Sequence, residues 1–198
     1  MKALSVTLAI IFMAALVVAQ TAEGGRHLDA PPPPAARDLL KQAIELAGQD
    51  RIEEAVANIK KAIAIAPSYL AAHQEYLRLR IQFQGKVDEA VAEYQSLMIR
   101  EPANPVYPAA LWLSGRAPSG SALFKKVAEL APEWSWGHYA NSFVILGRDY
   151  EMMNEKYEGR GEQILGEALK AIEQNRSVAN FYTQTIHLQE NQIGRAHV

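Results

Sequence analysis

Residues 50–55 read Asp-Arg-Ile-Glu-Glu-Ala and residues 85–90 read Gly-Lys-Val-Asp-Glu-Ala, so one pattern occurs twice in the chain. The two stretches begin 35 positions apart, and the same offset maps Pro67 onto Pro102. A fixed period of about 20–50 residues is typical of proteins that stack similar supersecondary units. The sequence therefore predicts a chain built from such units.

Each copy of the pattern opens a stretch with helical periodicity. The apolar residues of one face are Ile52, Ala55, Ile59, Ala62, Ile63 and Ala66 in the first copy, and Val87, Ala90, Val91, Tyr94 and Leu97 in the second. Small residues at Ala55 and Ala90 allow a paired helix to approach closely, and the prolines that follow end each helix. We therefore expect an all-α protein made of antiparallel helix pairs.

This pattern resembles the tetratricopeptide repeat family, in which W-x2-L-G-x2-Y, A-x3-F and P follow one another over about 34 residues. The second half of that motif is matched twice, by Ala55, Ile59 and Pro67 and by Ala90, Tyr94 and Pro102. The first half departs from the motif at Arg78, which stands where a small residue belongs, so the pairing or register of that helix stays open. The resemblance implies an α-solenoid of antiparallel helix hairpins that winds into a right-handed superhelix.

The chain is expected to divide into an export signal, a linker and a helical domain. Residues 1–19 are predicted to be a secretory signal peptide, because Lys2 precedes an uncharged apolar run; an uncleaved membrane anchor is the alternative. Residues 20–35 hold four consecutive prolines and are predicted to be a Pro-rich linker. The repeat domain is expected over 36–191, with units at about 36–69, 70–104, 105–132 and 133–176, then a partial helix.

The last residues carry an unusual signature. Residues 193–198 read Ile-Gly-Arg-Ala-His-Val, which resembles the in-frame translation of a widely used sequencing-library adapter. Residues 192–198 are therefore expected to be a non-native tail on a truncated chain. The signal at the other end predicts an exported protein, periplasmic or secreted, that meets a membrane only through that signal.

Composition excludes several classes of function. The 198 residues are 49% hydrophobic, which is enough for a packed core, and the net charge of −2 provides no basic surface for nucleic acid. The chain has no cysteine, so it contains neither disulfides nor thiolate metal sites. No Gly-rich phosphate loop and no pair of histidines at helical i, i+4 spacing occurs. We expect no catalysis, no metal and no cofactor in this chain.

The resemblance also implies a concave groove lined by the first helix of each hairpin. In the family's register the groove residues are Arg37, Lys41, Ile44, Glu75, Tyr76, Leu79, Gln82 and Phe83. This mixture of apolar, aromatic and charged groups suits an extended peptide or a partner helix. The expected function is protein–protein interaction or complex assembly, with the oligomeric state open. The alternative is an N-terminal accessory module of an exported enzyme, for example thioredoxin-like or a hydrolase, whose catalytic domain is lost by truncation.

An aromatic cluster opens the fourth predicted unit. Trp136, Tyr139 and Phe143 follow the family's first-helix pattern and are expected in the core. Trp134 does not fit that pattern, so an exposed aromatic contact for a peptide or glycan stays open as an alternative for this residue.

Overall fold

The computed structural model describes residues 25–116, 120–150 and 160–178. Over these residues the chain is all-α, with eight α-helices, two 3-10 helices, one π-helix and no strand, which confirms the predicted class. No helix in the described part of the chain is both long and apolar enough to cross a membrane. The predicted signal peptide, the tail at 192–198 and nearly all of the partial helix lie outside the described residues.

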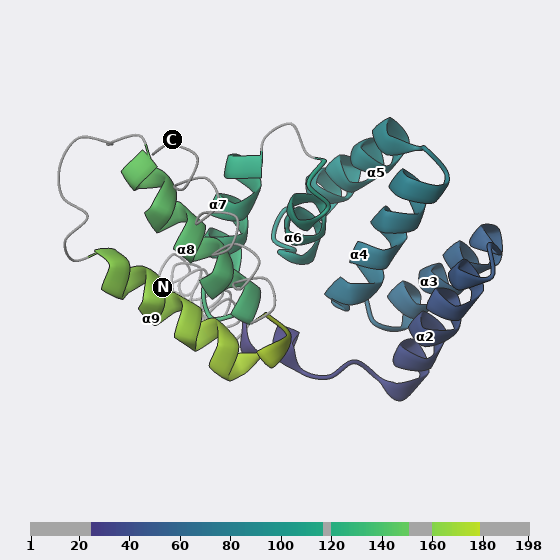
Figure 1. Cartoon of the computed structure of the whole chain (residues 1–198), viewed down its shortest axis with the longest axis horizontal. Helices are drawn as coiled ribbons and strands as arrows, with labels where there is room; N and C mark the ends of the chain where they lie inside the picture. The colour runs from purple at the N-terminus through teal and green to yellow at the C-terminus, as the bar shows by residue number, and fades with distance from the viewer. Residues whose placement is uncertain (1–24, 117–119, 151–159, 179–198) are drawn as a thin grey trace, which may run out of the picture.

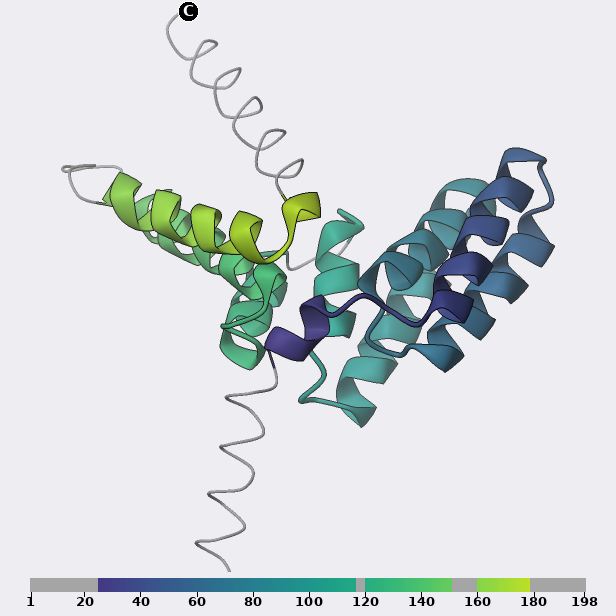
Figure 2. The same ribbon diagram turned by 90° about the horizontal axis from the view of Figure 1, so that it is seen from below.

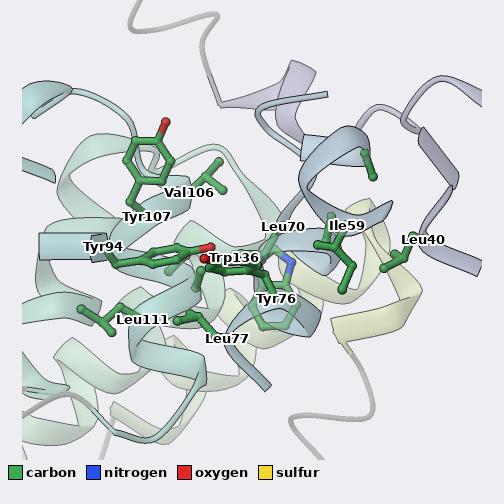
Figure 3. Packing of buried hydrophobic residues seen from close by; sticks show 14 of the residues in the cluster. Leu40, Ile59, Leu70, Tyr76, Leu77, Tyr94, Val106, Tyr107, Leu111 and Trp136 are labelled. Atoms are coloured by element: carbon green, nitrogen blue, oxygen red, sulfur yellow. The ribbon is translucent and has the colours of Figure 1, made fainter. Parts of the chain in front are cut away.

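Two groups of helices lie side by side, α2 to α6 in one and α7 to α9 in the other (Figure 1). Each predicted unit contains two of these helices. Their bounds are α2 (Pro34–Gly48), α3 (Ile52–Ile65), α4 (Leu70–Arg78), α5 (Val87–Arg100), α6 (Val106–Leu113), α7 (Gly120–Leu130), α8 (Ser135–Tyr150) and α9 (Arg160–Gln174). Buried side chains from both groups belong to one continuous core (Figure 3).

The first pair, α2 and α3, packs closely through small residues. Ala43 on α2 and Ala55 on α3 are fully buried, which lets the two backbones approach as the sequence predicts. The turn between the helices contains Asp50 in the left-handed region, at φ 62°. Gly85, which occupies the same position of the 35-residue period, has φ 67°. The recurring sequence pattern therefore corresponds to a recurring turn.

The second pair, α4 and α5, is joined through large side chains instead. The Tyr76 and Tyr94 rings lie 6.3 Å apart between their centroids, and Tyr94 is also hydrogen-bonded to His73. Directly after Arg78 the chain forms a π-helix, η2 (Leu79–Phe83), which adds one residue to the helical turn. The departure from the family motif at Arg78 thus coincides with a change in helix geometry.

Aromatic rings join α6, α7 and α8. Trp112 lies 5.4 Å from Tyr139 and 5.4 Å from Phe143, and Phe124 lies 5.8 Å from Phe143. Trp134, just before α8, is 1% exposed. The alternative of an exposed aromatic contact at Trp134 is therefore wrong, because the ring is enclosed by the core that begins α8.

Residues 25–33, which we call the strap, run from the start of α8 across the molecule to the start of α2 (Figure 2). The strap holds the 3-10 helix η1 (Arg26–Asp29), and Asp29 accepts hydrogen bonds from the Ser135 amide at 2.9 Å and from the Ser135 hydroxyl. A Cβ at Gly25 would lie 2.9 Å from the Trp134 amide nitrogen, so the close contact there requires glycine. The described part of the predicted linker is therefore docked on the domain and is not a free tether.

Candidate functional site

The predicted groove residues on α2 lie on one exposed stripe. Arg37, Lys41 and Ile44 follow each other at helical spacing and all are exposed, with Ile44 at 51%. Burial raises the pKa of Tyr69, and the positive charge of Arg37 opposes part of that rise. Arg37 therefore lies close enough to act on the Tyr69 hydroxyl. The start of this stripe is thus near the N-terminal end of α4.

On α4 the predicted groove register is wrong at two positions. Tyr76 is 3% exposed and Leu79, the first residue of η2, is fully buried, so neither lies on the accessible side of the helix; Tyr76 faces a small pocket on the opposite side instead. Glu75 is half-buried, while Gln82 and Phe83 are exposed as expected. The physical reason is that His73, Tyr76 and Leu77 form the buried side of α4 and the π-helix that follows adds a residue to the turn, so the helix does not keep the family's register.

The accessible side of α4 starts one residue earlier than predicted. We call it the α4 face; its residues are Ala71, Gln74, Glu75 and Arg78 of α4 and Gln82 of η2. The sequence analysis did not predict Ala71, Gln74 and Arg78 as groove residues. Their spacing of three or four positions is that of one helix face, so a register shifted by one residue would have included them.

Arg78 forms the centre of the α4 face. Its Nε and Nη2 atoms donate to the two Glu75 carboxylate oxygens at 2.7 and 2.5 Å, and its guanidinium lies 5.0 Å from the centroid of the Phe83 ring. These hydrogen bonds raise the pKa of Arg78, so it is charged at every physiological pH. The face therefore offers a fixed, planar cation between a carboxylate and an aromatic ring, a combination suited to a peptide's carboxylate or carbonyl groups.

An open cleft of about 700 Å³ continues the α4 face at its N-terminal end. We call it the strap cleft, since the strap forms one wall. Ala71 and Gln74 of the α4 face also line it, together with Tyr69 and with Asn175 and Arg176 beyond α9. Its walls mix polar and apolar groups, and its volume is in the range of known ligand clefts.

A second, smaller pocket of about 230 Å³ lies where α3, α4, α5 and α6 meet. We call it the tyrosine pocket, and it is lined by Lys60, Ile63, His73, Tyr76, Glu93, Tyr94, Leu97 and Tyr107. No sequence motif pointed to this pocket, because its residues come from four helices and share no spacing.

Hydrogen bonds fix the buried side of the tyrosine pocket. His73 Nε2 lies 2.9 Å from the Pro67 carbonyl oxygen, which can only accept, so this nitrogen carries the proton. His73 Nδ1 then accepts from the Tyr94 hydroxyl at 2.8 Å. Burial lowers the pKa of His73 and the bond to Pro67 opposes that shift only in part, so the ring is neutral.

A second buried histidine joins α8 to α9. His138 Nδ1 lies 2.7 Å from Glu167 Oε2, and its Nε2 lies 3.3 Å from the Gln174 amide. Burial alone would raise the pKa of Glu167, but hydrogen bonds from His138, Lys170 and Asn141 outweigh it and lower that pKa. Both ring nitrogens are engaged within the helix pair, which gives this cluster a structural role.

In the described ranges, no three His, Cys, Asp or Glu side chains gather closely enough to hold a metal ion. Comparison of the chain with protein-family models gives no match, and no curated protein matches its sequence closely enough to count as a relative. The α4 face, the strap cleft and the tyrosine pocket are therefore interpreted from their own chemistry.

Proposed function

We propose that the protein is an exported helical-repeat protein of the tetratricopeptide type that binds a peptide segment of a partner protein. The bound segment lies along the α4 face and enters the strap cleft. Export is part of the proposal and rests on the signal-like pattern of residues 1–19. Repeat architecture rests on the 35-residue period and on the paired helices that follow it.

One observation carries the proposal: the α4 face and the strap cleft are continuous, because Ala71 and Gln74 belong to both. Together they provide a continuous surface with a fixed cation at Arg78, and the Phe83 ring, which is 49% exposed, lies beside that cation. An extended peptide can place a carbonyl or carboxylate on the guanidinium and an apolar side chain beside the ring. Such a partner gains both orientation and buried apolar area.

A displayed library of random peptides, selected on the purified protein, tests this proposal. We expect the enriched peptides to share a short motif with an acidic residue, and to lose binding in the double variant Arg78→Glu, Gln82→Ala. Gln82 is exposed, but Arg78 is half-buried and its replacement leaves the Glu75 carboxylate without its partner, so circular dichroism and thermal unfolding check that the variant keeps the fold.

Arg51 provides a matched control for Arg78. It also pairs with a glutamate three positions away, through Nε to Glu54 at 2.7 Å and Nη2 at 2.6 Å, but it lies at the start of α3 outside the α4 face. The variant Arg51→Glu is expected to bind the selected peptides like the wild type. The proposal is contradicted if the enriched peptides bind the Arg78 variant as tightly as the wild type. It is also contradicted if Arg51→Glu weakens their binding as much as the Arg78 variant does.

A further inference from the structure

The tyrosine pocket contains a cation that belongs to the chain itself. The Lys60 ammonium of α3 lies 5.6 Å from the centroid of the Tyr76 ring of α4. The face of an aromatic ring carries partial negative charge and attracts cations. The pocket therefore already stabilises a positive charge at this point.

A carboxylate lies at the hydroxyl end of the same ring. The Tyr76 hydroxyl donates to Glu93 Oε2 at 2.7 Å, and Glu93 itself is exposed on α5. An exposed carboxylate keeps further acceptor positions for an incoming donor. The pocket therefore holds an aromatic face and, at the hydroxyl of the same ring, a carboxylate.

The remaining rings of the pocket are held in place. Tyr94 and Tyr107 stand nearly perpendicular, at 87° with centroids 6.2 Å apart, and His73 lies 5.7 Å from Tyr107 (Figure 3 shows the two tyrosines). His73 and Tyr94 bond each other, and the Tyr107 hydroxyl donates to Glu101 at 3.0 Å. Because each ring is fixed, a ligand does not have to order them on binding.

Lys60, by contrast, is loosely held. Its side chain is exposed, and in the described part of the chain no carboxylate forms an ion pair with its ammonium. A cation that enters the pocket therefore has to displace only the contact between Lys60 and the Tyr76 ring. The free-energy cost of losing an exposed cation–π pair is small.

We propose that the tyrosine pocket binds an organic ammonium group, which displaces the Lys60 ammonium from the Tyr76 ring and pairs with Glu93. The volume of about 230 Å³ admits a compact head such as trimethylammonium. This site lies outside the α4 face and does not depend on the peptide binding proposed above. The same chemistry is supplied by a free small ammonium compound or by a lysine side chain of a partner.

Titration of the full-length protein with choline, followed by NMR, tests the site. Choline is expected to shift the Tyr76 ring signals, whereas its neutral carbon isostere 3,3-dimethylbutan-1-ol, which has the same shape, is expected to leave them unchanged. Lys60→Gln removes the competing cation and is expected to tighten choline binding about threefold. Glu93→Gln removes the carboxylate and is expected to weaken it by a similar factor.

Two neighbouring residues supply matched controls. Lys61→Gln makes the same charge change one position along α3, and Glu89→Gln makes it one helical turn along α5, both at exposed side chains outside the pocket. Both variants are expected to bind choline like the wild type. Lack of saturation at about 10 mM choline, where even a 1 mM site is filled, would overturn the proposal. Equal binding of the neutral isostere would overturn it as well.

A tripeptide amide with a central lysine, titrated in the same way, distinguishes the two sources of the ammonium. Tighter binding of this peptide than of choline assigns the site to a partner's lysine, and tighter binding of choline assigns it to a free ammonium compound. Either result supports the ammonium site itself.

Discussion

Gly85 shows how one residue determines a turn. Its φ of 67° lies in the left-handed region, where a side chain costs about 1–2 kcal/mol, yet no atom lies within 4 Å of the position a Cβ would take. Gly85→Ala is therefore expected to lower the free energy of unfolding by about 1 kcal/mol through the backbone alone. Urea denaturation measures this change.

Gly48 is the matched control for that substitution. It is the last residue of α2, has no positive φ and is equally free of neighbours. Gly48→Ala is expected to raise the free energy of unfolding by about 0.5 kcal/mol, because alanine loses less entropy in a helix. If Gly85→Ala and Gly48→Ala changed the free energy of unfolding in the same direction, the explanation from the backbone conformation of Gly85 would be contradicted.

His73 makes stability depend on pH. Burial lowers its pKa below 6.5, so the unfolded chain binds a proton that the folded chain does not. The stability that the neutral, buried ring contributes is fully present above pH 6.5. It is lost as the pH falls through the folded-state pKa, where the buried ring takes up a proton. The free energy of unfolding is expected to drop between pH 7 and 5 by at most about 1.4 kcal/mol per pH unit from this group.

The variant His73→Gln separates this effect from that of the carboxylates. It is expected to be less stable than the wild type at pH 7 but to show a flatter pH dependence between pH 7 and 5. His27→Gln, at an exposed histidine, is expected to keep the slope of the wild type. An unchanged slope in His73→Gln would show that the ring is not neutral in the folded protein.

At the scale of elements, close packing distinguishes the first helix pair. Ala55 is fully buried between α2 and α3, whereas Ala57, two positions along, is exposed. Ala55→Leu is expected to destabilise the protein by about 1–3 kcal/mol, because the added atoms force the helices apart. Ala57→Leu is expected to change stability by less than about 0.5 kcal/mol. Thermal unfolding of both variants measures the difference.

The helices themselves were predictable because their signals are local. Pro67 and Pro102 predicted the ends of two helices, and α3 and α5 end at Ile65 and Arg100, within two residues of those prolines. The register of α4 was predicted wrongly, because the family motif placed Tyr76 on the groove side, whereas Tyr76 and Leu77 are both buried. The spacing of Ala71, Gln74 and Arg78 marks the accessible side, but the extra residue of the π-helix that follows leaves no signal in that spacing.

At the scale of the whole molecule, the strap joins distant parts of the chain. Asp29 and Ser135 are 106 positions apart, so no local pattern could predict their contact. The carboxylate lies at the N-terminus of α8, where negative charge is favourable. Asp29→Ala is expected to lower the free energy of unfolding by about 1 kcal/mol, the usual cost of losing a helix cap.

Asp38→Ala is the control for the strap, since Asp38 is an exposed aspartate of α2 that lies beyond the first turn of that helix. It is expected to change stability by less than about 0.5 kcal/mol. Hydrogen exchange adds a second readout: in Asp29→Ala the amide of Ser135 is expected to exchange faster. Unchanged exchange at Ser135 would show that the strap does not hold the start of α8.

The central claim is that the α4 face binds a partner segment through Arg78. Isothermal titration calorimetry of one selected peptide against the wild type, Arg78→Glu and Arg51→Glu tests it most directly. A hydrogen bond to a charged group contributes about 1.5–3 kcal/mol, so we expect Arg78→Glu to weaken binding at least about tenfold and Arg51→Glu to leave it unchanged. Equal affinity for all three proteins would contradict the account.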